Sequence, residues 1–199
     1  MVASVNLVTV AEKPRHKIRY LTPAEVDLLC KSARPARTGR RIVLAVRDEL
    51  LIRFSYNHGL RVSETARFLW EDINLDLRQV TVIRAKGSVN STHPLYDSEI
   101  RLLKRGKTIQ PPNTFHVFTH MDGSPLLLEG IKRIVVTAGR RAGLNRKVSS
   151  HMLRHACGYR LINDGIDIRV IQQYLGHKNI VHTARYTQLS PKAFTRFSF

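Results

Sequence analysis

The 199-residue sequence is poor in acidic residues and in cysteine, and it has no long apolar run. Only 15 aspartate and glutamate residues oppose 33 lysine and arginine residues, so the formal net charge is +18. Cys30 and Cys157 lie far apart and outside any CxxC pair, which argues against a disulfide framework and a zinc site. No stretch approaches the roughly 18 apolar residues of a membrane span, and no signal-peptide pattern opens the chain. These absences indicate a reduced cytoplasmic protein that does not associate with membranes.

The excess of positive charge needs a polyanionic partner. Hydrophobic residues make up 43% of the chain and charged residues 24%, which is typical of a globular domain and not of a disordered basic tail. Nucleic acid is therefore the default partner. One alternative stays open at this point, namely that lysine and arginine only cover exposed helices.

The apolar pattern predicts a mainly α domain with a small antiparallel β-sheet, an α+β fold. Residues 1–20 show no sustained periodicity and are expected to form a flexible basic arm. Thr22-Pro23-Ala24-Glu25 is a capping box that starts a helix ending near residue 33. Ser63 is expected to cap a short helix, and Asp97 or Ser98 another one. The remaining predicted elements are helices over residues 39–57, 63–69, 98–107, 128–142, 150–163, 167–175 and 179–187, and strands over 79–84 and 92–96.

Three separated segments carry groups that suit the handling of a phosphodiester: GLRVSE at 59–64, HMLRH at 151–155 and LGH at 175–177. Guanidinium groups make bidentate contacts to phosphate, so Arg61 and Arg154 are candidates for a phosphate clamp. Tyr186 is a candidate nucleophile, and Lys86, on the predicted hairpin, a candidate acid. No GxxxxGK[ST] motif and no acidic cluster for two metal ions is present. We therefore expect a metal-free covalent mechanism without a cofactor.

These segments, together with the run LGHKNIVHTARYT, resemble the tyrosine recombinases, also called phage-type integrases. The resemblance covers about residues 21–187 and implies the tyrosine-recombinase catalytic domain fold. It implies that Tyr186 attacks a DNA phosphate, that a 3′-phosphotyrosine forms, and that the 5′-hydroxyl of a partner strand reverses the step without ATP. In this reading Lys86 protonates the leaving oxygen, His151 assists proton transfer at Tyr186, and His177 hydrogen-bonds the phosphate. The implied catalytic set is Arg61, Lys86, His151, Arg154, His177 and Tyr186.

Most members of this family begin with a separate helical core-binding domain, whereas about 20 residues precede the catalytic domain here. We therefore expect a basic arm over 1–20 and a catalytic domain over 21–199, with no separate core-binding domain. The hairpin KGSVNSTHPL is similar to that of the fimbrial phase-variation invertases, bacterial recombinases that flip a promoter-bearing segment. This resemblance implies double-stranded DNA with inverted repeats, a recombinase tetramer on synapsed DNA, DNA-bending accessory proteins, and a place at the nucleoid in the bacterial cytoplasm.

Other functions stay open at this point. An integrase or transposon recombinase would use the same chemistry with another outcome, and a topoisomerase would use the same nucleophile on one duplex. A non-catalytic DNA-binding regulator would use the basic face alone, although a pure binder has no reason to keep Tyr186. His155 is expected to line the site, while His58, His93 and His182 are interpreted as structural.

Overall fold

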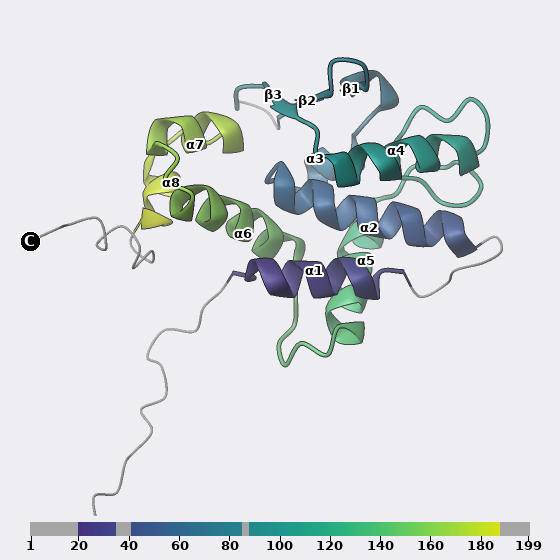
Figure 1. The fold of residues 1–199 in the computed structure, drawn as a ribbon, viewed down its shortest axis with the longest axis horizontal. Helices are drawn as coiled ribbons and strands as arrows, with labels where there is room; N and C mark the ends of the chain where they lie inside the picture. The colour runs from purple at the N-terminus through teal and green to yellow at the C-terminus, as the bar shows by residue number, and fades with distance from the viewer. Residues whose placement is uncertain (1–19, 35–40, 85–87, 188–199) are drawn as a thin grey trace, which may run out of the picture.

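The computed structural model of this chain describes residues 20–34, 41–84 and 88–187. Helix α2 (Arg41–Asn57) runs through the middle of the molecule, as Figure 1 shows. The other long helices pack around it: α1 (Pro23–Ser32), α4 (Asp97–Ile109), α5 (Leu128–Arg141) and α6 (Ser150–Asn163). The core therefore lies along α2, and the shorter elements lie at its rim.

Helix α1 begins where the sequence predicts. The hydroxyl oxygen of Thr22 accepts a hydrogen bond from the backbone N–H of Glu25 at 3.2 Å, and the Glu25 carboxylate accepts one from the N–H of Thr22 at 2.8 Å. Pro23 occupies the first helical position, where its missing N–H costs nothing. The predicted capping box is therefore confirmed.

A small antiparallel sheet lies between the short helix α3 (Val62–Ala66) and α4 in the chain order. Val80 pairs with His93 in this sheet, and the side chains of Val80 and Val82 are fully buried. This alternation confirms the predicted hairpin. The first strand was not predicted, because two residues are too few to show a period. The strands, in sheet order, are β1 (Ile73–Asn74), β2 (Gln79–Val82) and β3 (Ser91–Pro94).

The core is built around aromatic rings and holds both cysteines. The ring of Phe54 lies 5.4 Å from that of Phe68 and 6.0 Å from that of Phe118, and all three are buried. Burial raises the pKa of the Cys30 thiol to about 12 and that of the Cys157 thiol to about 11. Both cysteines are free and buried, so they act as small apolar residues, as predicted.

Some predicted helix boundaries are wrong, and side-chain hydrogen bonds explain two of them. The N-cap of α3 is Arg61 and not Ser63, because the Glu64 carboxylate accepts the backbone N–H of Arg61 at 2.8 Å. In the same way Glu99 accepts the N–H of Tyr96 at 2.9 Å, so Tyr96 and neither Asp97 nor Ser98 caps α4. The predicted helix over 63–69 ends at residue 66 and is followed by a 3-10 turn over Trp70–Asp72.

The C-terminal helices lie together beside α6 (Figure 1). Helix α7 (Ile168–Leu175) lies where a helix over 167–175 was predicted, and Asp167 is its N-cap, because its carboxylate accepts the N–H of Arg169 at 2.7 Å. Gly176 ends α7 with a φ of +63°, a conformation that glycine adopts without strain. Helix α8 (Val181–Ala184) is shorter than predicted. The predicted basic arm, apart from residue 20, lies outside the described residues. Within the described ranges no helix is long and apolar enough to cross a membrane.

Candidate active site

Five of the six predicted catalytic residues belong to the described ranges, and they come from the first half of α6 and from the ends of three short helices. Each comes from a helix or from a helix end, so the fold brings together segments that are far apart in sequence. Lys86 lies outside the described residues. The five are Arg61 before α3, His151 and Arg154 in α6, His177 after α7, and Tyr186 after α8.

Arg154 ties α6 to two of the predicted motifs. Its buried guanidinium donates to the backbone carbonyl of Gly59 and, at 2.6 Å, to that of Leu175. Burial lowers the pKa of Arg154 to about 10, and the positive charges of Arg61 and Arg84 act in the same direction. The group remains a cation at neutral pH, fixed between GLRVSE and LGH.

Glu64 is the centre of the cluster. Its Oε1 atom accepts from Arg61 at 2.7 Å, its Oε2 atom accepts from Arg84 at 2.9 Å, and Arg154 lies 3.8 Å from Oε2. Burial opposes the carboxylate charge, but Arg84 and the hydrogen bonds from Arg61 outweigh it and hold the pKa of Glu64 below its ordinary value. Three guanidinium groups therefore surround one carboxylate, which leaves a net positive site that suits an anion.

Arg84 is a site residue that the sequence analysis missed. Its side chain is fully buried at the end of β2 and donates to the carbonyls of His58, at 3.2 Å, and Tyr174. Burial lowers its pKa, while Glu64 stabilises its charge. One local signal was present in the sequence. Period-two alternation places residue 84 on the same face as the buried Val80 and Val82, so an inward-facing arginine was foreseeable.

Tyr186 is held against α6 with its hydroxyl beside a histidine. The hydroxyl oxygen lies 3.2 Å from Nδ1 of His155, and the ring contacts Tyr159 edge to face at 5.2 Å. Gly158 allows this approach, because a Cβ atom there would lie 2.6 Å from the Tyr186 ring. Burial raises the pKa of Tyr186 to about 12, and Arg154 opposes the shift. The position of His155 confirms that it lines the site.

Two further histidines flank this contact. The ring of His151 meets that of His155 edge to face at 4.8 Å, so His155 lies between His151 and Tyr186. On the other side His177 lies 6.3 Å from the Tyr186 ring and nearly parallel to it, with Nδ1 2.9 Å from the Thr183 hydroxyl. Burial, and then Arg154, lower the pKa of His177 to about 3 and also lower the pKa of His151. All of these rings are neutral at pH 7 in this environment.

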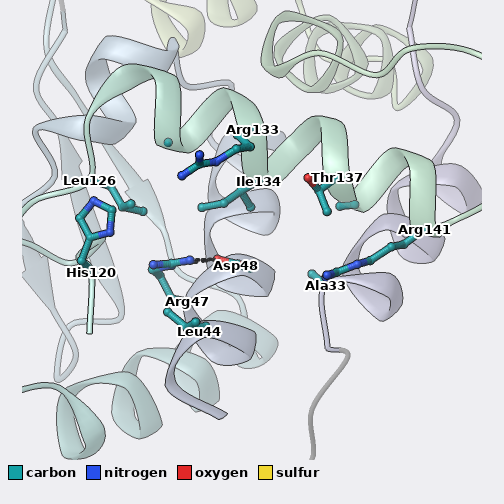
Figure 2. A pocket seen from close by; sticks show the side chains of 12 residues that line it. Ala33, Leu44, Arg47, Asp48, His120, Leu126, Arg133, Ile134, Thr137 and Arg141 are labelled. Atoms are coloured by element: carbon teal, nitrogen blue, oxygen red, sulfur yellow. Dashed lines mark hydrogen bonds and ion pairs between the residues drawn. The ribbon is translucent and has the colours of Figure 1, made fainter. Parts of the chain in front are cut away.

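A separate basic cavity of about 320 Å³ lies between α2 and α5 (Figure 2). Arg47, Arg133 and Arg141 line it together with one carboxylate, that of Asp48. The guanidinium of Arg47 donates to Asp48 and to the carbonyl of Thr119, each at 2.8 Å. Burial raises the pKa of Asp48, and Arg47 opposes the shift. None of the predicted catalytic residues lines this cavity, so it is distinct from the arginine and tyrosine cluster.

Residues 19–193 match the sequence model of the phage integrase family. The chain belongs to this family. The type 1 fimbriae regulatory protein FimB of Escherichia coli K12 is 38% identical over 175 residues, which span 86% of this chain and 84% of FimB. The chain is thus a tyrosine-type site-specific DNA recombinase, as the resemblance predicted.

Solved structures of other recombinases share the fold. The crystal structure of XerA recombinase superposes with a TM-score of 0.78 at 24% identity and covers 94% of this chain and 68% of that one. XerH recombinase, in a post-cleavage complex with a palindromic difH substrate, gives a TM-score of 0.73 at 24% identity over 88% of this chain and 51% of that one. The predicted fold, mainly helical with a small antiparallel sheet, is confirmed.

Proposed function

We propose that this recombinase inverts a promoter-bearing DNA segment that controls fimbrial phase variation, and that it cuts and rejoins DNA through Tyr186. One observation carries the proposal for the chemistry: the Tyr186 hydroxyl lies beside His155 and feels the charge of Arg154, which belongs to a group of three arginines around the Glu64 carboxylate. The biological outcome is inferred from FimB, which is named a type 1 fimbriae regulatory protein.

In the proposed step, the Tyr186 oxygen attacks the scissile phosphorus and the bond to the 5′-oxygen breaks. The phosphate stays on the tyrosine as a 3′-phosphotyrosine, and the 5′-oxygen leaves with a proton from Lys86. Attack by a 5′-hydroxyl from a partner strand then restores the phosphodiester and returns the tyrosine hydroxyl. One phosphoester bond forms for each that breaks, so the reaction needs no ATP.

Arg61 and Arg154 stabilise the nonbridging oxygens in this scheme. The side chain of Arg61 is 30% exposed and can be reached from solvent, while that of Arg154 is 4% exposed. A guanidinium has five N–H donors, and Arg154 therefore keeps donors for phosphate after binding two carbonyls. His177 adds a hydrogen bond to the phosphate. Fixed positive groups of this kind need no reorganisation as charge develops.

The proton of Tyr186 has a defined acceptor in the same scheme. The family resemblance implies this task for His151, but the described contacts place His155 at the hydroxyl and His151 behind it. We assign the first transfer to His155 Nδ1 and the exchange with solvent to His151, whose side chain is exposed. The two histidines then form a short path from the buried hydroxyl to water.

The assembly part of the proposal follows the family. The post-cleavage complex of XerH with its palindromic substrate supports double-stranded DNA as the partner. We propose inverted repeats as the binding sites, a tetramer on synapsed DNA, help from DNA-bending accessory proteins, and action on the nucleoid in the cytoplasm. Residues 21–199 form the catalytic domain, and the basic residues before them contact DNA.

An inversion assay tests this function. A plasmid that carries a reporter promoter between the inverted repeats of a fimbrial switch is incubated with the protein and with the Tyr186→Phe variant. We expect inverted product from the wild type and none from the variant. Excised or integrated product would support an integrase or transposon recombinase instead. Bound DNA without any rearrangement, under conditions in which a related active recombinase rearranges its own substrate, would favour the non-catalytic regulator.

A further inference from the structure

A second basic cavity, of about 570 Å³, opens at the N-terminal end of α6, between α5 and the segment that enters α6. Most of its polar lining is positively charged or carries hydroxyl groups. Its single carboxylate, Glu129, already accepts a hydrogen bond from Lys132 at 2.5 Å, so the cavity keeps a net positive charge. The polar side chains that line it are those of Glu129, Lys132, Arg133, Lys147, Ser149 and Ser150.

Ser150 lines this cavity with a buried side chain. The residue is only 9% exposed, and its Oγ atom is buried without a hydrogen-bond partner among the described residues. Buried hydroxyls nearly always have a partner in folded proteins. A serine that has none and lines a positively charged cavity points to an anionic ligand.

The helix end supplies the second part of the site. Helix α6 has 14 residues and begins after the N-cap Ser149, whose side chain makes no capping hydrogen bond. The first N–H groups of a helix have no acceptor within it, and they carry a partial positive charge. Lys147, Ser149 and Ser150 therefore line one cavity at the positive end of a helix, an arrangement that suits a phosphate.

We propose that this cavity binds a backbone phosphate of the same DNA strand, one or two nucleotides from the scissile phosphate. The assignment rests on the proposed function, because Arg154 marks the scissile position. Ser150 and Arg154 are both buried and lie one helical turn apart on α6, a separation of about 6 Å along the helix axis. A DNA strand rises about 3.4 Å per nucleotide along the duplex axis, so a strand that runs along α6 would place a phosphate one or two nucleotides from the scissile one at this cavity. The site fixes the register of the strand on α6.

A double-mutant cycle tests whether Ser150 and Lys147 contact the same phosphate. Binding of the full-length protein to a labelled duplex is measured by fluorescence anisotropy for Ser150→Ala, Lys147→Ala and the double variant. We expect each single change to weaken binding by up to about tenfold. The affinity of the double variant should fall by less than the product of the two single losses, because both side chains contact the same phosphate and the second change removes a contact already weakened by the first. An unchanged affinity for Ser150→Ala, or fully multiplicative losses, would overturn the proposal.

A substrate scan then locates the phosphate. Single methylphosphonate substitutions, which remove one backbone charge, are placed at five positions on each side of the cleavage site in an inverted-repeat duplex. The wild type should lose affinity at a neighbour of the scissile phosphate, and the double variant should be insensitive there while it keeps its sensitivity elsewhere. Equal profiles for the two proteins would contradict the assignment.

Lys104→Ala is the matched control, since Lys104 is exposed on α4, which lies across α2 from this cavity. The duplex affinity of this variant should lie within about twofold of that of the wild type. Its sensitivity to each methylphosphonate position should also match that of the wild type. The test is also separable from the proposed chemistry. Failure to cleave with an intact binding cycle would reject the covalent mechanism alone, whereas cleavage with no effect of Ser150→Ala would reject this site alone.

Discussion

The Nδ1 atom of His155 lies 3.2 Å from the hydroxyl oxygen of Tyr186, across 31 residues of sequence. Burial lowers the pKa of His155 to about 4, helped by His151 and Arg154, and it raises the pKa of Tyr186 to about 12. At neutral pH the pair is therefore an uncharged imidazole and a protonated phenol. Burial makes the phenol proton hard to remove. The imidazole is placed to accept this proton when the tyrosine oxygen attacks.

Replacing His155 by phenylalanine should slow formation of the covalent adduct by about 100-fold or more, because a positioned base typically contributes that much. The measurement is the single-turnover rate on a nicked duplex, with DNA affinity measured in parallel. His120→Phe is a matched control, since His120 is exposed in another part of the chain. A His155→Phe enzyme that reacts at the wild-type rate would refute the role of this contact.

Gly158→Ala should impair cleavage without unfolding the protein. The new Cβ atom would lie 2.6 Å from ring carbons of Tyr186, so the ring has to move and the hydroxyl leaves His155. Alanine also favours the helix by about 1 kcal/mol relative to glycine. Gly106→Ala in α4 is the control, because its nearest neighbour is 4.0 Å away. Equal adduct yields from the two variants would show that Tyr186 does not depend on this packing.

Glu64→Gln should destabilise the fold by about 3–5 kcal/mol, because it leaves buried guanidinium groups without their carboxylate. The free energy of unfolding in urea measures the effect. Asp97→Asn serves as the control, because the ion pair of Asp97 with Arg78 is exposed and such pairs contribute little to stability. A loss for Glu64→Gln as small as that of the control would contradict the central place of Glu64.

Stability should fall as the pH drops from 7 to 5. Burial is the main cause that lowers the pKa of His93 to about 2, of His155 to about 4 and of His177 to about 3. Each takes up a proton near pH 6.5 once unfolded but stays neutral when folded, so acid favours the unfolded state. Urea unfolding curves at several pH values measure this dependence. A free energy of unfolding that is constant or rises as the pH falls to 5 would disagree with these assignments.

Local signals in the sequence were enough for most of the fold. The capping box at Thr22, the glycine at 176 and the period-two run before Arg84 each act over a few residues, and the structure follows them. The motifs also gave the right fold, because their order along the chain is specific to one family. The start of α3 was predicted too late in the chain. Ser63 is a typical N-cap residue, but the Glu64 side chain accepts the backbone N–H of Arg61 and so starts the helix after Arg61.

The environment of the site could not be predicted in the same way. Arg84 donates to the carbonyl of Tyr174, 90 residues away, and no local spacing reveals such a contact. For the same reason the sequence could not show that His155, and not His151, lies beside the Tyr186 hydroxyl. The two histidines share one helix face, and only the position of the segment that carries Tyr186 decides which of them the hydroxyl meets.

The most direct test of the mechanism is a suicide-substrate assay. A nicked duplex with the inverted repeats of a fimbrial switch is incubated with the protein in a buffer free of metal ions and ATP, and the products are separated under denaturing conditions. The mechanism predicts a covalent protein–DNA adduct whose 3′-phosphate maps to Tyr186 by mass spectrometry and which is absent from Tyr186→Phe. An adduct at another residue would contradict it, and so would retarded DNA without any adduct under conditions in which a related active recombinase forms one.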